Sequence, residues 1–271
     1  MKAKASKLLL VALAAVMLLG CFGCQSEAAD NSLNYIKENG KLIMGLDDSF
    51  PPMGFRDEKN EIVGFDVDIA KEVTSRMGVE LVLQPIDWKA KEMELKNKNV
   101  DVLWNGFTIT EERKQELTFS EPYMYNEQII VVKADSSIAS KADLAGKVIA
   151  LQDGSSAVDA LDKDEALKNS LKDTVGFADN VKALMDLANG QVDAVLVDSV
   201  VGNYYVSLES NAGKFKVLDD VLAQEEYGIG MRKGDTALKN EIDKIIQEMI
   251  DDGTYKTISE KWFGKDVSIK K

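Results

Sequence analysis

The chain contains no histidine, and its only two cysteines, Cys21 and Cys24, lie close to the N-terminus. Without imidazole there can be no Ser-His-Asp or Cys-His catalytic arrangement and no histidine ligand for a metal. Because no cysteine follows residue 24, the folded part of the chain has neither a disulfide framework nor a thiolate metal site. An enzyme built from this sequence would depend on carboxylates, lysine or tyrosine. We predict neither a cofactor nor a metal.

Positive charge is also scarce, and arginine is the scarcest part of it. The formal net charge is −13, and only four of the 33 basic residues are arginines. So acidic a chain is unsuited to nucleic acid and to an anionic membrane surface. The rarity of arginine singles out Arg113, which ends the stretch WNGFTITEER over 104–113.

The apolar run near the N-terminus, over 8–19, is too short to cross a bilayer comfortably. It follows three lysines, which is typical of an export signal. We therefore predict a signal peptide over 1–20, followed by a flexible polar tether over 21–32.

The end of this signal, LLGC over 18–21, resembles the bacterial lipobox. The resemblance implies a lipoprotein with palmitate on Cys21, anchored to the outer face of the bacterial cell membrane. Cys24 is the poorer lipidation site because Cys21 and Phe22 replace the apolar residues before it. The alternative is an ordinary secretory signal that happens to end in a cysteine.

After the tether, short apolar runs alternate with segments of helical period, which indicates an α/β protein with mostly parallel strands. We predict strands over 42–46, 79–83 and 100–104. Apolar residues spaced four apart over 65–77 predict a helix that ends at Gly78. Asp87 is a candidate N-cap for another helix that continues to Lys96.

The second half of the chain repeats the plan of the first. KLIMGLDDS over 41–49 is echoed by KVIALQDGS over 147–155, and NVDVLWN over 99–105 by QVDAVLVD over 191–198. In both halves polar residues follow the strands, and open α/β sheets bind ligands at these carboxyl ends. Two such edges facing each other predict a cleft between two similar lobes.

We predict that residues 33–125 and 226–271 form the first lobe and residues 126–225 the second. The segment after residue 226 is too small for a third domain, so we expect it to pack on the first lobe. The chain then crosses between the lobes twice, near 125–127 and 223–226. Two crossing strands make a hinge that can open and close.

Arg113 is a candidate ligand for an anion. Gly106 lets the backbone approach a ligand, and Thr108 adds a hydroxyl. Thr110 can cap a helix that begins at Glu111 and carries Arg113 in its first turn. A guanidinium presents paired donors matched to a carboxylate. The alternative is that Arg113 forms a surface ion pair with an acid of its own helix, Glu112 or Glu116.

Asp198 ends the equivalent strand of the second lobe and supplies the opposite charge. Together, Arg113 and Asp198 fit a zwitterion, with the carboxylate at the arginine and the ammonium group at the aspartate. The alternative for Asp198 is a cap for the helix that follows.

Six motifs, in order, cover essentially the whole mature chain: LDDSFPPMGF, GFDVDIAKEV, WNGFTITEER, FSEPY, LQDGSS and VDAVLVDS. They resemble the family 3 extracellular solute-binding proteins, which deliver polar amino acids to ABC transporters. The resemblance implies a periplasmic-binding-protein fold of type II, with two Rossmann-like lobes joined by a two-strand hinge. It also implies that Arg113 binds the ligand α-carboxylate, assisted by the Gly106 amide, Thr108 and Ser156, and that Asp198 binds the α-ammonium group.

The same resemblance assigns the ligand side chain to other positions. Phe50 and Trp88 match two aromatic walls, although both could instead belong to the core. Asp47 matches an acid that reaches the far end of basic or amide ligands, and Gln152 adds a polar contact. Asn105 departs from the serine or alanine of other members, which leaves the depth of the pocket open. We expect the preceding tryptophan to be core.

These assignments predict the binding component of an ABC importer, a monomer that is not an enzyme. Its partners would be a free polar L-amino acid and the permease and ATPase of the transporter. Lysine, arginine and glutamine fit best, glutamate and aspartate are disfavoured, and cystine stays open. The alternatives are a dehydratase that uses Asp47, Asp48 or Asp198 as acid or base, and an amino-acid sensor.

Overall fold

The computed structural model describes residues 30–269. The predicted signal peptide, both cysteines and most of the tether lie outside the described residues. In the part that is described, no helix is both long enough and apolar enough to span a membrane.

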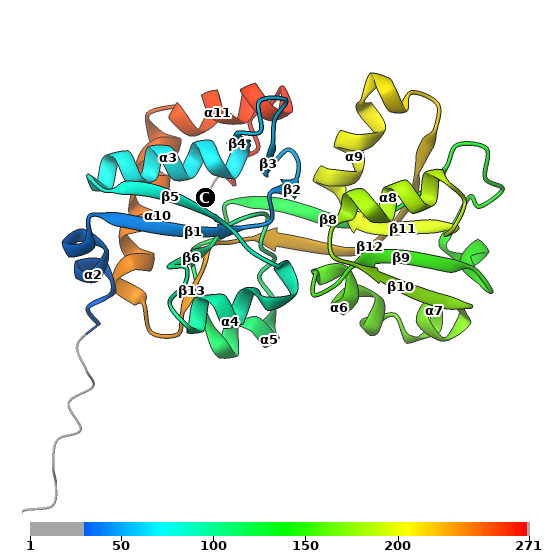
Figure 1. Ribbon diagram of the computed structural model, residues 1–271, viewed down its shortest axis with the longest axis horizontal. Helices are drawn as coiled ribbons and strands as arrows, with labels where there is room; N and C mark the ends of the chain where they lie inside the picture. Colours follow the sequence, from blue (N-terminus) through cyan, green and yellow to red (C-terminus); the bar gives the residue numbers. More distant parts are fainter. Residues whose placement is uncertain (1–29, 270–271) are drawn as a thin grey trace, which may run out of the picture. The chain divides into compact units, whose positions relative to one another are not determined.

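Two five-stranded sheets organise the chain (Figure 1). The first has the order β5-β1-β6-β13-β7 and consists of β5 (Glu80–Pro85), β1 (Lys41–Leu46), β6 (Val102–Leu103), β13 (Gly230–Arg232) and β7 (Leu117–Phe119). A small sheet of β2 (Ser49–Phe50), β3 (Gly54–Arg56) and β4 (Ile62–Val63) follows β1. The second five-stranded sheet has the order β10-β9-β11-β8-β12 and consists of β10 (Asp173–Phe177), β9 (Val148–Gln152), β11 (Ala194–Asp198), β8 (Met124–Lys133) and β12 (Phe215–Tyr227).

Helices cover both faces of each large sheet (Figure 1). Those associated with the first sheet are α2 (Ser32–Asn39), α3 (Phe65–Met77), η1 (Trp88–Ala90), α4 (Lys91–Lys96), α5 (Glu111–Glu116), α10 (Thr236–Asp251) and α11 (Thr254–Phe263). Those associated with the second are η2 (Lys141–Leu144), α6 (Ser156–Lys163), α7 (Glu165–Ser170), α8 (Asn180–Ala188), α9 (Ser199–Ser207) and η3 (Glu209–Asn211). The two-lobed α/β fold predicted from the sequence is confirmed.

The repeat seen in the sequence corresponds to a repeated strand order. In the first sheet β1 lies between β5 and β6 and is parallel to both. In the second sheet β9 lies between β10 and β11 and is again parallel to both. The matched sequence segments therefore occupy matched strands, and the residues that follow them emerge at equivalent sheet edges.

The longest strands join the two lobes. β8 and β12 pair antiparallel, with Tyr125 opposite Glu226 and Asn126 opposite Glu225. After β12 the chain enters β13, which lies between β6 and β7 of the first sheet. The predicted two-strand hinge is thus the β8 and β12 pair.

The helix predicted over 65–77 is α3, and its apolar face is buried. It ends at Gly78, whose φ of 72° lies in the left-handed region favoured by glycine. The predicted helix after Asp87 begins differently, because a 3₁₀ turn precedes α4; Asp87 caps that turn by accepting the backbone N–H of Lys89.

β6 is shorter than the predicted strand over 100–104. Beside its start, the Asp101 side chain accepts the N–H of Ile43 on the neighbouring strand at 3.0 Å, and the Asp101 N–H donates to the Ile43 carbonyl at 2.8 Å. Trp104, which follows β6, is fully buried in the core as expected.

Candidate functional site

A small cavity lies where the two lobes meet, and nine of the ten predicted site residues line it. They are Phe50, Trp88, Asn105, Gly106, Thr108, Arg113, Gln152, Ser156 and Asp198. Phe107 and Ser155 also line the cavity and were not predicted, although each is next to predicted residues in the quoted motifs. Asp47 is absent from the lining.

The cavity measures about 10 Å³, close to the roughly 10–15 Å³ that one water molecule needs. Larger grooves, of about 640 Å³ beside Trp262 and about 730 Å³ beside Met93, contain none of the predicted residues. Thr108 and Ser156 also line a groove of about 470 Å³, but an amino acid can reach the other predicted residues of the cavity only if the lobes separate.

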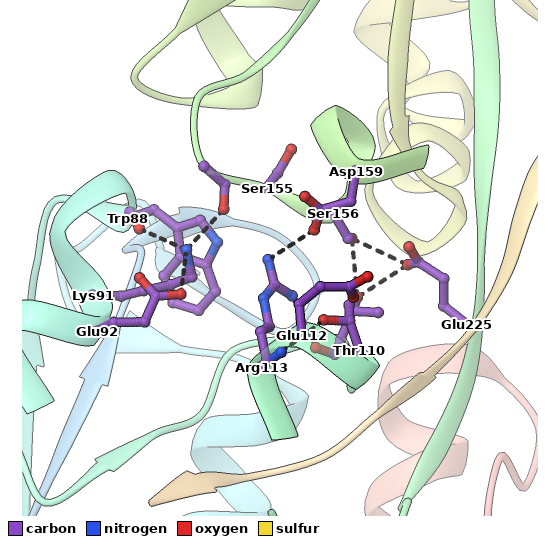
Figure 2. A network of polar contacts seen from close by, with 12 residues as sticks. Trp88, Lys91, Glu92, Thr110, Glu112, Arg113, Ser155, Ser156, Asp159 and Glu225 are labelled. Atoms are coloured by element: carbon purple, nitrogen blue, oxygen red, sulfur yellow. Dashed lines mark hydrogen bonds and ion pairs between the residues drawn. The ribbon is translucent and has the colours of Figure 1, made fainter. Parts of the chain in front are cut away.

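Arg113 lies on α5, held by the predicted cap. The Thr110 hydroxyl oxygen accepts the backbone N–H of Arg113 at 3.1 Å. The guanidinium donates to the Thr108 carbonyl at 2.8 Å, and its carbon lies 4.7 Å from the centre of the Phe107 ring. Its ion pair, at 3.6 Å, is with Asp159 of α6 in the second lobe (Figure 2). The side chain is only 11% exposed, so the alternative of a surface pair within its own helix is wrong.

Asp198 lies at the end of β11 and is buried. One carboxylate oxygen accepts hydrogen bonds from the Asn126 amide and the Tyr227 hydroxyl, each at 2.7 Å. Asp198 occupies the N-cap position of α9, but its side chain makes no capping hydrogen bond there. Burial, followed by the nearby charge of Glu225, raises the pKa of Asp198 to about 7.

Gly106 is tightly packed, and its backbone N–H already donates a hydrogen bond within the protein. Its φ of 57° is left-handed, and a Cβ there would lie 2.9 Å from the Phe50 ring and 3.1 Å from Tyr227. The Gly106 N–H donates to Asp66 at 2.7 Å. The resemblance implied that this amide assists in binding the ligand carboxylate; in the structure its N–H is bonded to Asp66 of α3.

Asp66 is a buried carboxyl that the sequence reading did not single out. Its Oδ2 accepts hydrogen bonds from the Gly106 N–H and, at 3.0 Å, from the Tyr123 hydroxyl. Its other oxygen has no hydrogen-bond partner among residues 30–269. Burial raises the pKa of Asp66 to about 7. The motif GFDVDIAKEV contains Asp66, but nothing in its pattern shows what the side chain contacts.

Thr108 and Ser156 approach each other from opposite lobes, with their hydroxyl oxygens 3.0 Å apart. Ser156 also contacts Glu225 of β12 at 3.2 Å (Figure 2), and Thr108 contacts it at 3.0 Å. Gln128 of β8 donates to Ser156 at 3.2 Å and to Glu225 at 3.1 Å. Glu225 was not predicted, because a half-buried acid on a strand has no local signature.

Asp47 lies just behind the cavity wall and joins the two lobes. Its carboxylate accepts from Ser49 at 2.6 Å and from Gln152 of the second lobe at 2.6 Å. The Asp47 N–H donates to the Asn105 side-chain oxygen at 3.0 Å. Asn105 therefore fixes the turn after β1, which gives this residue a structural role. Burial raises the pKa of Asp47.

Phe50 and Trp88 line the cavity and are also largely buried. The two interpretations of these aromatics, as walls of the site and as core residues, are therefore compatible. The ring of Trp88 meets Phe107 edge to face, with 5.7 Å between ring centres. Beneath Trp88 lies Lys91, a buried cation that the sequence reading missed.

Lys91 is 2% exposed and makes contacts in both lobes (Figure 2). Its ammonium group donates to the carbonyl of Trp88 at 3.2 Å and to that of Gly154, in the second lobe, at 2.7 Å. It also pairs with Glu92 at 3.2 Å. Burial lowers the pKa of Lys91.

Known proteins resemble this chain along nearly its whole length. The profile of the bacterial extracellular solute-binding proteins, family 3, matches residues 42–265. The L-cystine-binding protein TcyJ of Escherichia coli K12 is 32% identical over 263 residues, which cover 96% of each chain. The arginine-binding extracellular protein ArtP of Bacillus subtilis is 30% identical over 264 residues, 95% of this chain and 98% of that protein.

A solved structure agrees with these relatives. The substrate-binding protein of an ABC uptake transporter from Streptococcus pneumoniae, with bound histidine, superposes with a TM-score of 0.86 at 37% identity. The superposition covers 90% of this chain and 100% of the other.

Proposed function

Because the chain belongs to the bacterial extracellular solute-binding proteins of family 3, we propose that it captures a free polar L-amino acid for an ABC importer. Opposite charges on opposite lobes are the observation that carries the proposal. Arg113 of the first lobe and Asp198 of the second line the same cavity. A zwitterion held between them contacts both lobes at once.

In this proposal the arginine binds the α-carboxylate and the aspartate binds the α-ammonium group. Both charges are largely buried, and charge-assisted hydrogen bonds are stronger where water is excluded. Asp159 pairs with Arg113 at 3.6 Å with its own side chain 45% exposed. A ligand carboxylate can displace so long and exposed a pair at little cost.

Closure of the lobes supplies the coupling between binding and transport. The moving units would be residues 33–125 with 226–271 and residues 126–225, turning about β8 and β12. A ligand that contacts both lobes favours the closed population by the difference between its contacts in the two states. The closed form would then be recognised by the permease and its ATPase. Attachment through a lipidated Cys21 would keep a monomeric receptor close to that permease.

The side chain of the ligand would lie between Phe50 and Trp88, toward Asp47 and Gln152. A flat amide can stack on such rings, and a cationic stem gains roughly 1 kcal/mol from them. We therefore propose a basic amino acid such as lysine or arginine, or glutamine. Relatives named for cystine and arginine place cystine among the ligands to be tested.

Isothermal titration against the twenty amino acids and cystine tests the proposal. We expect micromolar or tighter binding to at least one of them. Repeating the titration at several salt concentrations identifies the side-chain charge, because a cation held by Asp47 is more sensitive to salt than a neutral amide. Binding to none of these ligands, or turnover of a prephenate-like acid, would contradict the proposal.

A further inference from the structure

Glu225 belongs to the hinge, yet its side chain contacts both lobes. It lies on β12 opposite Asn126 of β8. One carboxylate oxygen, Oε2, accepts from Thr108 of the first lobe at 3.0 Å and from Ser156 of the second at 3.2 Å. The amides of Asn126 and Gln128 add hydrogen bonds of 2.8 and 3.1 Å to the same oxygen. Four groups converge on an acid that the proposed binding reaction does not use.

The hydroxyl protons at this position can be located by counting donors. A carboxylate only accepts, and each hydroxyl has a single proton. Thr108, Ser156 and Glu225 form a triangle of three contacts, of 3.0, 3.0 and 3.2 Å. Both hydroxyl protons are used inside this triangle, whichever of the three contacts they form. What the two hydroxyls can offer to the cavity is therefore their lone pairs.

Asp198 belongs to the same network. The Asn126 amide nitrogen donates to Asp198 at 2.7 Å and to Glu225 at 2.8 Å. Neither carboxylate has an ion-pair partner within 30–269. This end of the cavity therefore combines hydroxyl acceptors with negative charge and lacks a neutralising cation in the described chain. An ammonium group, with three N–H donors and a positive charge, matches it.

We propose that Glu225 is a positioning residue: by accepting the hydroxyl protons of Thr108 and Ser156, it makes this end of the cavity a binding site for the α-ammonium group. This inference rests on the proposed function. It reassigns the two hydroxyls from the ligand carboxylate, where the resemblance placed them, to the ammonium group. Arg113 then binds the carboxylate without them.

The variant Glu225→Gln removes the charge and keeps the size of the side chain. Three ligands separate the possible roles: the amino acid found by titration, its carboxamide, which keeps the ammonium group, and its des-amino acid, which keeps the carboxylate. We expect the variant to bind the first two about tenfold more weakly, and the des-amino acid as well as or better than the wild type does. Glu226→Gln, at an exposed position on the same strand, is the matched control and should bind all three as the wild type does.

A double-mutant cycle shows whether Glu225 acts through the hydroxyls. In a Thr108→Val background Glu225→Gln should weaken amino-acid binding only about twofold or threefold, because one of the two hydroxyls that Glu225 positions is missing. Thermal unfolding confirms that each variant is folded.

Several results would overturn the inference. They are unchanged binding of the amino acid by Glu225→Gln, an equal loss for the des-amino acid, or the same factor in both backgrounds. Failure of the wild type to bind any amino acid would instead refute the proposed function, so the two failures are distinguishable.

Discussion

Two buried aspartates, Asp66 and Asp198, resemble each other in burial and in their tyrosine partner but differ in their position relative to the cavity. Each accepts a hydrogen bond from a tyrosine, Tyr123 at 3.0 Å for Asp66 and Tyr227 at 2.7 Å for Asp198. Burial raises the pKa of each to about 7. Only Asp198 lines the cavity, whereas Asp66 lies behind it and holds the Gly106 N–H. Burial alone therefore does not distinguish a binding group from a supporting one, but access to the cavity does.

Asp198→Asn should produce the largest change in binding. Removing one partner of a buried charge pair costs roughly 2 kcal/mol or more, so we expect at least about 30-fold weaker binding of the amino acid. In the wild type, affinity should fall as the pH drops below about 7, because protonated Asp198 no longer pairs with an ammonium group. Titration calorimetry at pH 6, 7 and 8 measures both effects. A variant that keeps the affinity or the pH dependence of the wild type would contradict the assignment.

Asp66→Asn should change stability more than binding. A carboxyl pKa raised from 3.8 to about 7 means that the folded state retains the proton more strongly than the unfolded state does. The stabilisation that protonated Asp66 gives to the folded state is therefore fully present below about pH 4 and is lost as the pH rises through about 7. Asparagine does not titrate. Between pH 5 and pH 8 the free energy of unfolding of the variant should therefore fall by on the order of 2 kcal/mol less than that of the wild type.

Urea unfolding at several pH values measures how the free energy of unfolding of Asp66→Asn changes with pH; this change per pH unit is the slope to be compared. The exposed position Asp162, paired with Lys168 on the surface, provides the control variant Asp162→Asn, whose slope should match that of the wild type. A slope unchanged in Asp66→Asn would show that this carboxyl is ionised in the fold at neutral pH.

Arg113→Lys extends the comparison to the opposite charge. Lysine keeps the charge but loses the paired donors that match a carboxylate, so we expect about tenfold weaker binding. Arg76→Lys is the matched control, since Arg76 forms ion pairs with Glu72 and Asp252 on the surface. Calorimetry should show no effect there. Equal affinities for Arg113→Lys and the wild type would refute the carboxylate assignment.

Two lysines of the first lobe that contact the second lobe give the smallest expected effect. Lys91 is buried and bonds the Gly154 carbonyl at 2.7 Å, whereas Lys89 is 66% exposed and pairs with Asp153 at 3.0 Å. Exposed pairs contribute little, so Lys89→Met should bind within about twofold of the wild type. Lys91→Met should weaken binding about threefold to fivefold, because it removes a buried bond of the closed form. The reverse order would show that closure depends on the surface pair.

Local pattern predicted most of the first lobe's elements. The helical period over 65–77 and the cap at Thr110 needed only neighbouring residues, and both are present. The internal repeat also located the ends of β6 and β11, and thereby Arg113 and Asp198. The strand predicted over 100–104 was too long, since β6 covers Val102–Leu103; beside it the Asp101 side chain accepts the Ile43 N–H.

The sequence predicted which residues lie at the site more accurately than it predicted which groups those residues contact. Nine predicted residues line one cavity, but the Gly106 amide is bonded to Asp66, 40 positions away. Thr108 is bonded to Glu225, 117 positions away. Which acid meets which donor over such separations depends on how the sheets dock, and no local spacing encodes it.

By itself, the sequence determined the α/β class, the repeated strand plan and the placement of Arg113 and Asp198 after matched strands. These follow from periodicity, capping and charge, which act between near neighbours. Only the tertiary structure decided that Asn105 supports the turn of Asp47, that Lys91 bonds across the lobes and that Glu225 takes the hydroxyl protons. A hydrogen bond requires two groups within about 3 Å, and folding alone sets that distance for residues far apart in the chain.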